Sequence, residues 1–133
     1  MTGSNAWSFL RKVLVVDGVI SGACGLTLVL GAGPLERWLG IPAALLRPVG
    51  LTLFPFTALL LSLARRAALS RATVGGVIAA NGIWVAGSVL LLVSGWIDPT
   101  GLGYAFVVGQ AAVVAVFAEM EYVGLKKSGA VEA

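Results

Sequence analysis

The chain has 133 residues, of which 59% are hydrophobic and only 11% are charged, and its mean hydropathy is +0.99. A soluble domain carries about 25% charged residues to cover its surface, so the composition excludes a soluble domain and a disordered chain. The net charge of +3 is too small and too dispersed for a nucleic-acid-binding surface, and one Cys cannot form an internal disulfide. The absence of His excludes His-ligated metals and a His general base.

Four apolar runs reach the length of about 20 residues that a membrane-spanning helix needs. They cover about residues 13–32, 45–64, 74–96 and 102–123. Helices are expected because the backbone must satisfy its own hydrogen bonds in lipid. The sequence therefore predicts an all-α protein, in which residues 1–133 form a single integral membrane domain. The expected fold is a four-helix transmembrane bundle with antiparallel, up-down topology.

Charge placement predicts the orientation of the spans. Two Lys/Arg residues lie on one side of the membrane, Arg37 and Arg47, and seven lie on the other side: Arg11, Lys12, Arg65, Arg66, Arg71, Lys126 and Lys127. This bias predicts a multi-pass protein of the bacterial inner membrane with both termini in the cytoplasm. Aromatic residues are expected at the two boundaries, namely Trp38, Trp96 and Tyr104 outside and Trp7 and Tyr122 inside, whereas Trp84 falls in mid-span. A cleaved signal peptide is the less favoured alternative, because the first run is longer than 7–15 residues and contains Asp17.

The connections between the spans are short. In the first connection, Leu35, Trp38 and Leu39 are spaced as on one face of a helix. Either an amphipathic turn or an irregular loop at the membrane surface fits this segment, and we expect the loop. Thr73 is the expected N-cap of the third span. Residues 98–101 have the composition of a tight turn, so the third and fourth spans are expected to be antiparallel neighbours.

Asp17 is the first candidate functional residue, because a carboxylate inside a span is rare and marks a functional site by default. It lies five residues beyond Lys12, or about 7 Å along a helix. We expect a structural pairing with Arg65 or Arg66, and the alternative is a role in transport or gating.

Glu119, Asn81 and Gln110 are the other polar candidates within the spans. On a helical wheel Glu119 shares a stripe with the small residues Ala112 and Ala115, whereas Glu121 lies on the stripe of larger residues. Small stripes are where membrane helices touch, so the two glutamates are not expected to face inward along one seam, and Glu119 is kept as the candidate residue. Asn81 and Gln110 both lie near mid-membrane on neighbouring spans, so a hydrogen bond between them is expected to hold those spans together.

Two stripes of small residues are predicted to be helix-packing surfaces. The first consists of Gly18, Ser21, Gly22 and Gly25, and the second of Gly75, Ala79, Gly82 and Ala86. Pro55 is expected to kink the second span by freeing the carbonyl of Leu51, with Thr52 as a compensating donor.

The motif search identifies no nucleotide-binding loop, Cys pair or metal cluster. The sequence therefore predicts no catalytic residue, no cofactor and no metal site. Cys24 lacks a base nearby in the sequence, so it is interpreted as packing.

Four segments resemble a set of uncharacterised small four-span bacterial integral membrane proteins. They are LERWLGIP (35–42), LLRPVG (45–50), LFPF (53–56) and FAEMEYVGLKK (117–127). The layout is also loosely similar to that of the DoxX-like group. Neither resemblance implies a functional motif or a site residue.

The predicted function is that of a non-enzymatic membrane protein, an accessory or scaffold subunit. Its expected partners are the lipid bilayer and either further copies of itself or a larger membrane complex, with no nucleic acid. The alternative is a small homo-oligomeric transporter or channel that uses Asp17 or Glu119 as an ion- or proton-coupled site.

Overall fold

The computed structural model describes residues 3–66 and 70–128, and all regular structure in these ranges is helical. Four helices are long and one is short. In chain order they are α1 (Gly3–Leu30), α2 (Ala32–Leu39), α3 (Ala43–Ala64), α4 (Arg71–Ser94) and α5 (Gly101–Ser128).

The four long helices are apolar and long enough to cross a membrane, which confirms the four predicted spans. By length and composition the spans are Ala6–Leu30, Ala43–Ala64, Arg71–Ser94 and Gly101–Lys127. Their outer surfaces are apolar, since Leu30 is 75%, Ile83 72% and Val93 73% exposed. Exposed aliphatic side chains of this kind suit contact with lipid and not with water, so the chain is a multi-pass membrane protein.

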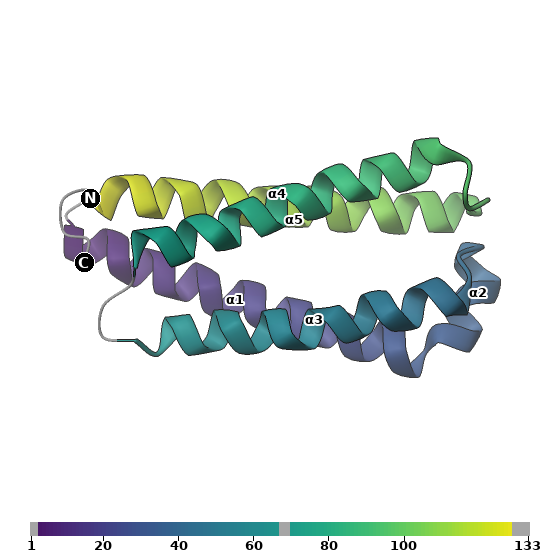
Figure 1. Cartoon of the computed structure of the whole chain (residues 1–133), viewed down its shortest axis with the longest axis horizontal. Coiled ribbons are helices and arrows are strands. Elements are labelled where there is room, and N and C mark those ends of the chain that lie inside the picture. Colours follow the sequence, from purple (N-terminus) through teal and green to yellow (C-terminus); the bar gives the residue numbers. More distant parts are fainter. Residues whose placement is uncertain (1–2, 67–69, 129–133) are drawn as a thin grey trace.

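The helices associate as two pairs. α1 packs along α3 and α4 packs along α5, and the pairs are joined mainly where α1 contacts α5. The backbones of α3 and α4 make no comparable contact. Figure 1 shows the beginning of α1 and the end of α5 at one end of the molecule, which we call the termini end, and α2 at the other, the α2 end.

Glycines bring α1 and α3 into backbone contact. A Cβ atom added at Gly25 would lie 2.9 Å from the carbonyl oxygen of Gly50, and one added at Gly50 would lie 2.9 Å from that of Gly25. Gly18 and Gly22 also lie against α3, where added Cβ atoms would meet Leu61 at 3.0 Å and Thr57 at 3.2 Å. Ser21, in the same stripe, is half-buried.

The second stripe of small residues, on α4, has a different place in the structure. Ala79, Gly82 and Ala86 are exposed, Gly75 is half-buried, and Cβ atoms added at Gly75 or Gly82 would meet nothing within 4 Å. Within the described chain this face of α4 therefore packs against no other helix.

The first connection forms a helix, α2, so the expected loop is wrong. Its amphipathic pattern decides this, because Ala32 and Leu39 are buried while Trp38 faces outward. Gly40 ends the helix with φ +68°, a left-handed conformation that glycine adopts without strain, and donates its N–H to the carbonyl of Glu36.

The C-terminal end of α2 is fastened to the start of α5. Thr100 donates its N–H to the carbonyl of Leu39 at 2.9 Å and its hydroxyl to that of Trp38 at 2.7 Å. Gly103 lies so close to the Leu39 carbonyl that any Cβ there would collide with it. These bonds satisfy carbonyls that the end of a helix leaves unpaired.

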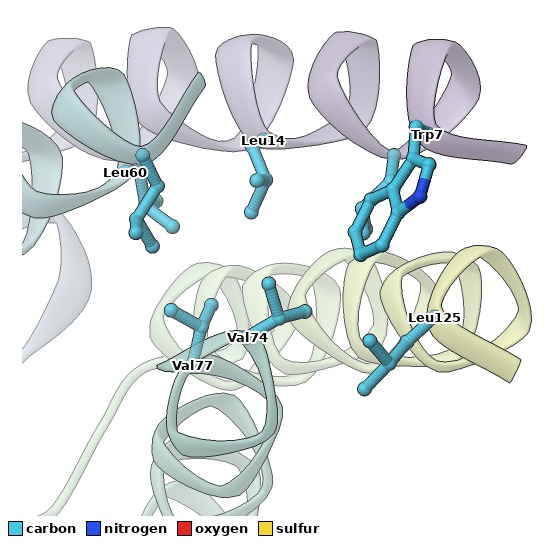
Figure 2. Packing of buried hydrophobic residues seen from close by; sticks show 8 residues of the cluster. Trp7, Leu14, Leu60, Val74, Val77 and Leu125 are labelled. Atoms are coloured by element: carbon cyan, nitrogen blue, oxygen red, sulfur yellow. The ribbon is translucent and has the colours of Figure 1, made fainter. Parts of the chain in front are cut away.

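Two apolar cores fill the bundle, one toward each end. The core at the termini end draws on all four long helices, as Figure 2 shows for six labelled residues, and consists of Trp7, Leu10, Leu14, Leu60, Leu63, Val74, Val77 and Leu125. Trp7 is only 8% exposed, so its side chain packs in this core. α1 begins at Gly3, before the expected start of the first span at about residue 13. The second core lies toward the α2 end and includes Leu28, Leu39, Leu46, Leu53 and Val107.

Two local expectations need correction. The N-cap of α4 is Ser70 and not Thr73, because the Ser70 side chain accepts the N–H of Thr73 at 3.3 Å. In α3, which contains Pro55 in its interior, Thr52 donates its hydroxyl to the carbonyl of Val49 at 2.7 Å and not to that of Leu51.

Candidate functional site

Two carboxylates and one amide from three helices meet inside the bundle, beside the core at the termini end. The Nδ2 atom of Asn81 donates to Oδ2 of Asp17 at 3.2 Å and to Oε1 of Glu121 at 2.9 Å. Ser21 adds a hydrogen bond from its hydroxyl to Oδ1 of Asp17 at 3.2 Å. We call these residues the Asp17–Asn81–Glu121 cluster.

The cluster is enclosed and short of hydrogen-bond donors. Asp17 is 2%, Asn81 4% and Glu121 0% exposed. Both carboxylates receive their hydrogen bonds from uncharged donors, and the Oε2 atom of Glu121 is buried without a hydrogen-bond partner in the described chain. An unpaired oxygen of this kind is costly if it carries negative charge, and two carboxylates that share one amide group repel one another unless a proton or cation lies with them.

The expected pairing of Asp17 with Arg65 or Arg66 is not present. Both arginines are exposed, and the Arg66 carbonyl instead accepts a hydrogen bond from Arg11 at 2.9 Å. Asp17 instead lies at the level of Asn81 and well inside α1, because that helix begins at Gly3, before Lys12.

Asn81 and Gln110 are not bonded to each other, contrary to expectation. Gln110 accepts the indole N–H of Trp84 at 2.7 Å and donates to the hydroxyl of Ser88 at 3.0 Å. Trp84 thus has a polar partner that accounts for its mid-span position. We call this second set the Trp84–Gln110–Ser88 group.

Two adjoining cavities lie between the helix pairs. The first, of about 320 Å³, is lined by residues of all four long helices, including Asp17 and Asn81. The second, of about 310 Å³, extends toward the α2 end and is lined by Ile41 and Leu45 among others. Cys24, Trp84 and Gln110 line both cavities, so the two cavities adjoin one another at these residues.

The structure buries Glu121 and leaves Glu119 exposed. α5 turns its larger residues inward, including Val107, Phe117 and Glu121, so its small-residue stripe is not the packing face. On a helical wheel of this span, Glu121 falls on the same stripe as Gln110. Two polar residues on one stripe of a membrane helix are the signal that could have identified the buried acid.

No group of three Cys, Asp or Glu residues within residues 3–66 and 70–128 is arranged to hold a metal ion. Comparisons of the chain with protein-family models, with curated proteins and with solved structures found no match. The chemistry of the site must therefore be argued from its own geometry.

Proposed function

We propose that the protein is a small proton-coupled carrier, in which the Asp17–Asn81–Glu121 cluster takes up and releases a proton beside a cavity within the membrane. The observation that carries this proposal is the juxtaposition of two buried carboxylates on a single amide, with Oε2 of Glu121 left without a donor. Ionisable groups inside membrane proteins mark ion and proton pathways, and this pair borders a cavity through Asp17.

The proposed chemistry is an exchange of charge and involves no covalent step. With one proton bound, the cluster holds a single negative charge that Ser21 and Asn81 stabilise by hydrogen bonds. Loss of that proton leaves two neighbouring negative charges in an apolar environment, which favours either proton uptake or the arrival of another cation. The cluster thus couples proton release to the occupancy of the cavity. No enzymatic activity and no cofactor form part of this function.

The proposed orientation places both termini in the cytoplasm of a bacterial cell, with consecutive long helices running in opposite directions. It is supported by the excess of Lys and Arg at the termini end of the molecule. In this orientation the cluster lies nearer the cytoplasmic surface, because its neighbours Leu14 and Val77 belong to the core at the termini end.

Infrared spectroscopy of the protein in lipid tests the proton site. At neutral pH the wild type is expected to show the carbonyl-stretch band of a protonated carboxylic acid, and the Asp17→Asn, Glu121→Gln double variant is expected to lose it. Glu119→Gln is the matched control, because it changes an exposed carboxylate on the same helix, and it should keep the band.

Absence of the band from the wild type, or its persistence in the double variant, contradicts the proposal. Thermal unfolding of each variant in detergent verifies that the amide substitutions, which conserve shape, leave the bundle folded.

A second candidate function is that of an accessory or scaffold subunit, in further copies of this chain or in a larger complex. The face of α4 formed by Gly75, Ala79, Gly82 and Ala86 supports it, because added Cβ atoms at Gly75 and Gly82 meet nothing within 4 Å. Faces of small residues allow another membrane helix to approach closely. The carrier function is preferred because a scaffold has no need of two buried carboxylates.

A further inference from the structure

We infer that the two adjoining cavities bind a lipophilic organic cation, whose charged group lies at Asp17 and whose apolar body fills the space toward the α2 end. This inference rests on the proposed function, because the charge that attracts the cation is that of the cluster after it has released its proton. It names the class of solute that the carrier accepts.

The lining of the first cavity selects for charge and for apolar character together. Asp17 supplies a carboxylate at the end near the cluster, while Phe56, Trp84 and Phe117 line the same cavity. Aromatic faces attract organic cations, and the attraction is stronger where water is excluded. The remaining lining is mostly aliphatic, for example Ile20 and Leu53.

Other solute classes fit the cavities less well. The described residues that line them include no Lys or Arg, so an anion finds no positive partner. A sugar or other polar solute needs many hydrogen-bond partners, whereas the second cavity offers only a few polar groups, such as Ser88 and Gln110. A neutral lipophile makes no favourable charge interaction with the carboxylate of Asp17.

The first cavity is open to the surface of the bundle that faces lipid. One exposed residue from each long helix lines it, namely Ile20, Thr52, Ala80 and Val113. A lipophilic cation concentrates in the bilayer and can therefore reach the cavity from the side. Together the two cavities are large enough for a ligand of drug-like size.

Proton and solute compete for the same charge. The titratable groups that face the cavity and the cluster within the described chain are Asp17 and Cys24 on α1 and Glu121 on α5. Arg11 and Arg71 lie toward the termini end, where they donate to the carbonyls of Arg66 and Leu125. Because raising the pH removes the competing proton, the affinity for the cation is expected to rise with pH.

The test is calorimetric titration of the purified full-length protein in detergent with tetraphenylphosphonium, using tetraphenylborate as an anion of nearly the same shape. The wild type is expected to bind the cation and not the anion. Asp17→Asn should weaken cation binding by roughly tenfold or more, since it removes a close opposite charge in an environment of low dielectric constant.

Two neighbouring alanines on α4 provide a steric test that leaves the charge untouched. Ala80 lines the first cavity, whereas Ala79 lines neither, and both are exposed on a helix with few buried residues. Ala80→Phe should abolish binding of tetraphenylphosphonium, and Ala79→Phe and Glu119→Gln should leave it unchanged.

Equal binding of cation and anion, no binding by the wild type, or unchanged binding by Asp17→Asn and Ala80→Phe would each overturn the inference. Failure here is distinguishable from failure of the proposed function, which the infrared band decides independently. If the infrared band of the protonated acid is present but tetraphenylphosphonium does not bind, the proposed proton site stands and the carrier accepts a different class of solute.

Discussion

α1 packs on α3 through glycines, whereas α4 packs on α5 with the help of side-chain hydrogen bonds. Gly25 and Gly50 let two backbones touch on the first interface. On the second interface, Trp84 and Ser88 of α4 bond Gln110 of α5. Apolar membrane helices gain little from hydrophobic burial against one another. They associate either by close approach of their backbones, as α1 and α3 do, or by polar bonds, as α4 and α5 do.

The difference also shows how the two pairs are joined. Asn81 on α4 bonds both Asp17 on α1 and Glu121 on α5, so the polar cluster connects the glycine-packed pair to the hydrogen-bonded pair. Under the proposed carrier function, a shift of one pair against the other would change the hydrogen bonds of Asn81.

The largest effect is expected from Gly50→Val, which breaks the α1–α3 interface. A Cβ atom at residue 50 would lie 2.9 Å from the Gly25 carbonyl oxygen and 2.9 Å from Cβ of Leu28. Overpacking of this kind costs about 1–3 kcal/mol, occasionally more. Thermal unfolding in detergent should show a clearly lower midpoint than for the wild type.

The matched control is Gly82→Val on α4, because a Cβ atom added at Gly82 would meet none of the described residues within 4 Å. It should leave the midpoint of the isolated chain unchanged. Equal midpoints for Gly50→Val and the wild type would show that the backbone contact is not as close as described. A loss in Gly82→Val as large as that in Gly50→Val would favour the scaffold function, because it would place another helix on α4.

A smaller effect is expected from Trp84→Phe, which weakens the α4–α5 interface. The substitution removes the donor of the 2.7 Å bond to Gln110, and interhelical bonds of this kind are worth about 0.6 kcal/mol on average and about 1.7 at most. Trp96→Phe is the control, since Trp96 is 85% exposed. If denaturation in detergent shows that Trp84→Phe is less stable than Gly50→Val, the hydrogen bonds between α4 and α5 contribute more to stability than the glycine contacts between α1 and α3.

The smallest effect is expected from Gly75→Ala. The added methyl group meets nothing within 4 Å and alanine is the better helix former, so stability should stay within about 0.5 kcal/mol of the wild type, as for most surface changes. A fall of several degrees in the unfolding midpoint would mean that this face of α4 is covered in the folded state.

The spans could be predicted from the sequence because an apolar run of membrane length allows only a helix. The inward faces could not, because in lipid both sides of a helix are apolar and the periodicity that marks the buried face of a soluble helix is weak. Stripes of small residues mark Gly22 and Gly82 equally as packing positions, yet among the described residues Gly22 lies against another helix and Gly82 does not. The two glycines differ in whether another helix faces them, and this cannot be read from the sequence of one span alone.

The candidate site was predictable only in its parts. Asp17 and Asn81 stand out as polar residues within spans, but their hydrogen bond joins residues 64 positions apart and depends on how the helix pairs meet. Glu119 and Glu121 are two positions apart and have the same chemistry, so composition cannot tell which one is buried. The cavities are lined by side chains of all four long helices, so they are a property of the whole bundle.

The polar cluster also has a consequence for the order in which the protein is made. Among the four spans described, Asp17 belongs to the first, Asn81 to the third and Glu121 to the fourth. During synthesis Asp17 therefore lies in the membrane without its hydrogen bond from Asn81 until α4 has been inserted. The bonds of Asn81 are complete only when α5 arrives. A chain that lacks α4 and α5 keeps Asp17 in lipid without the hydrogen bond from Asn81, and a polar group left without its partner there is costly.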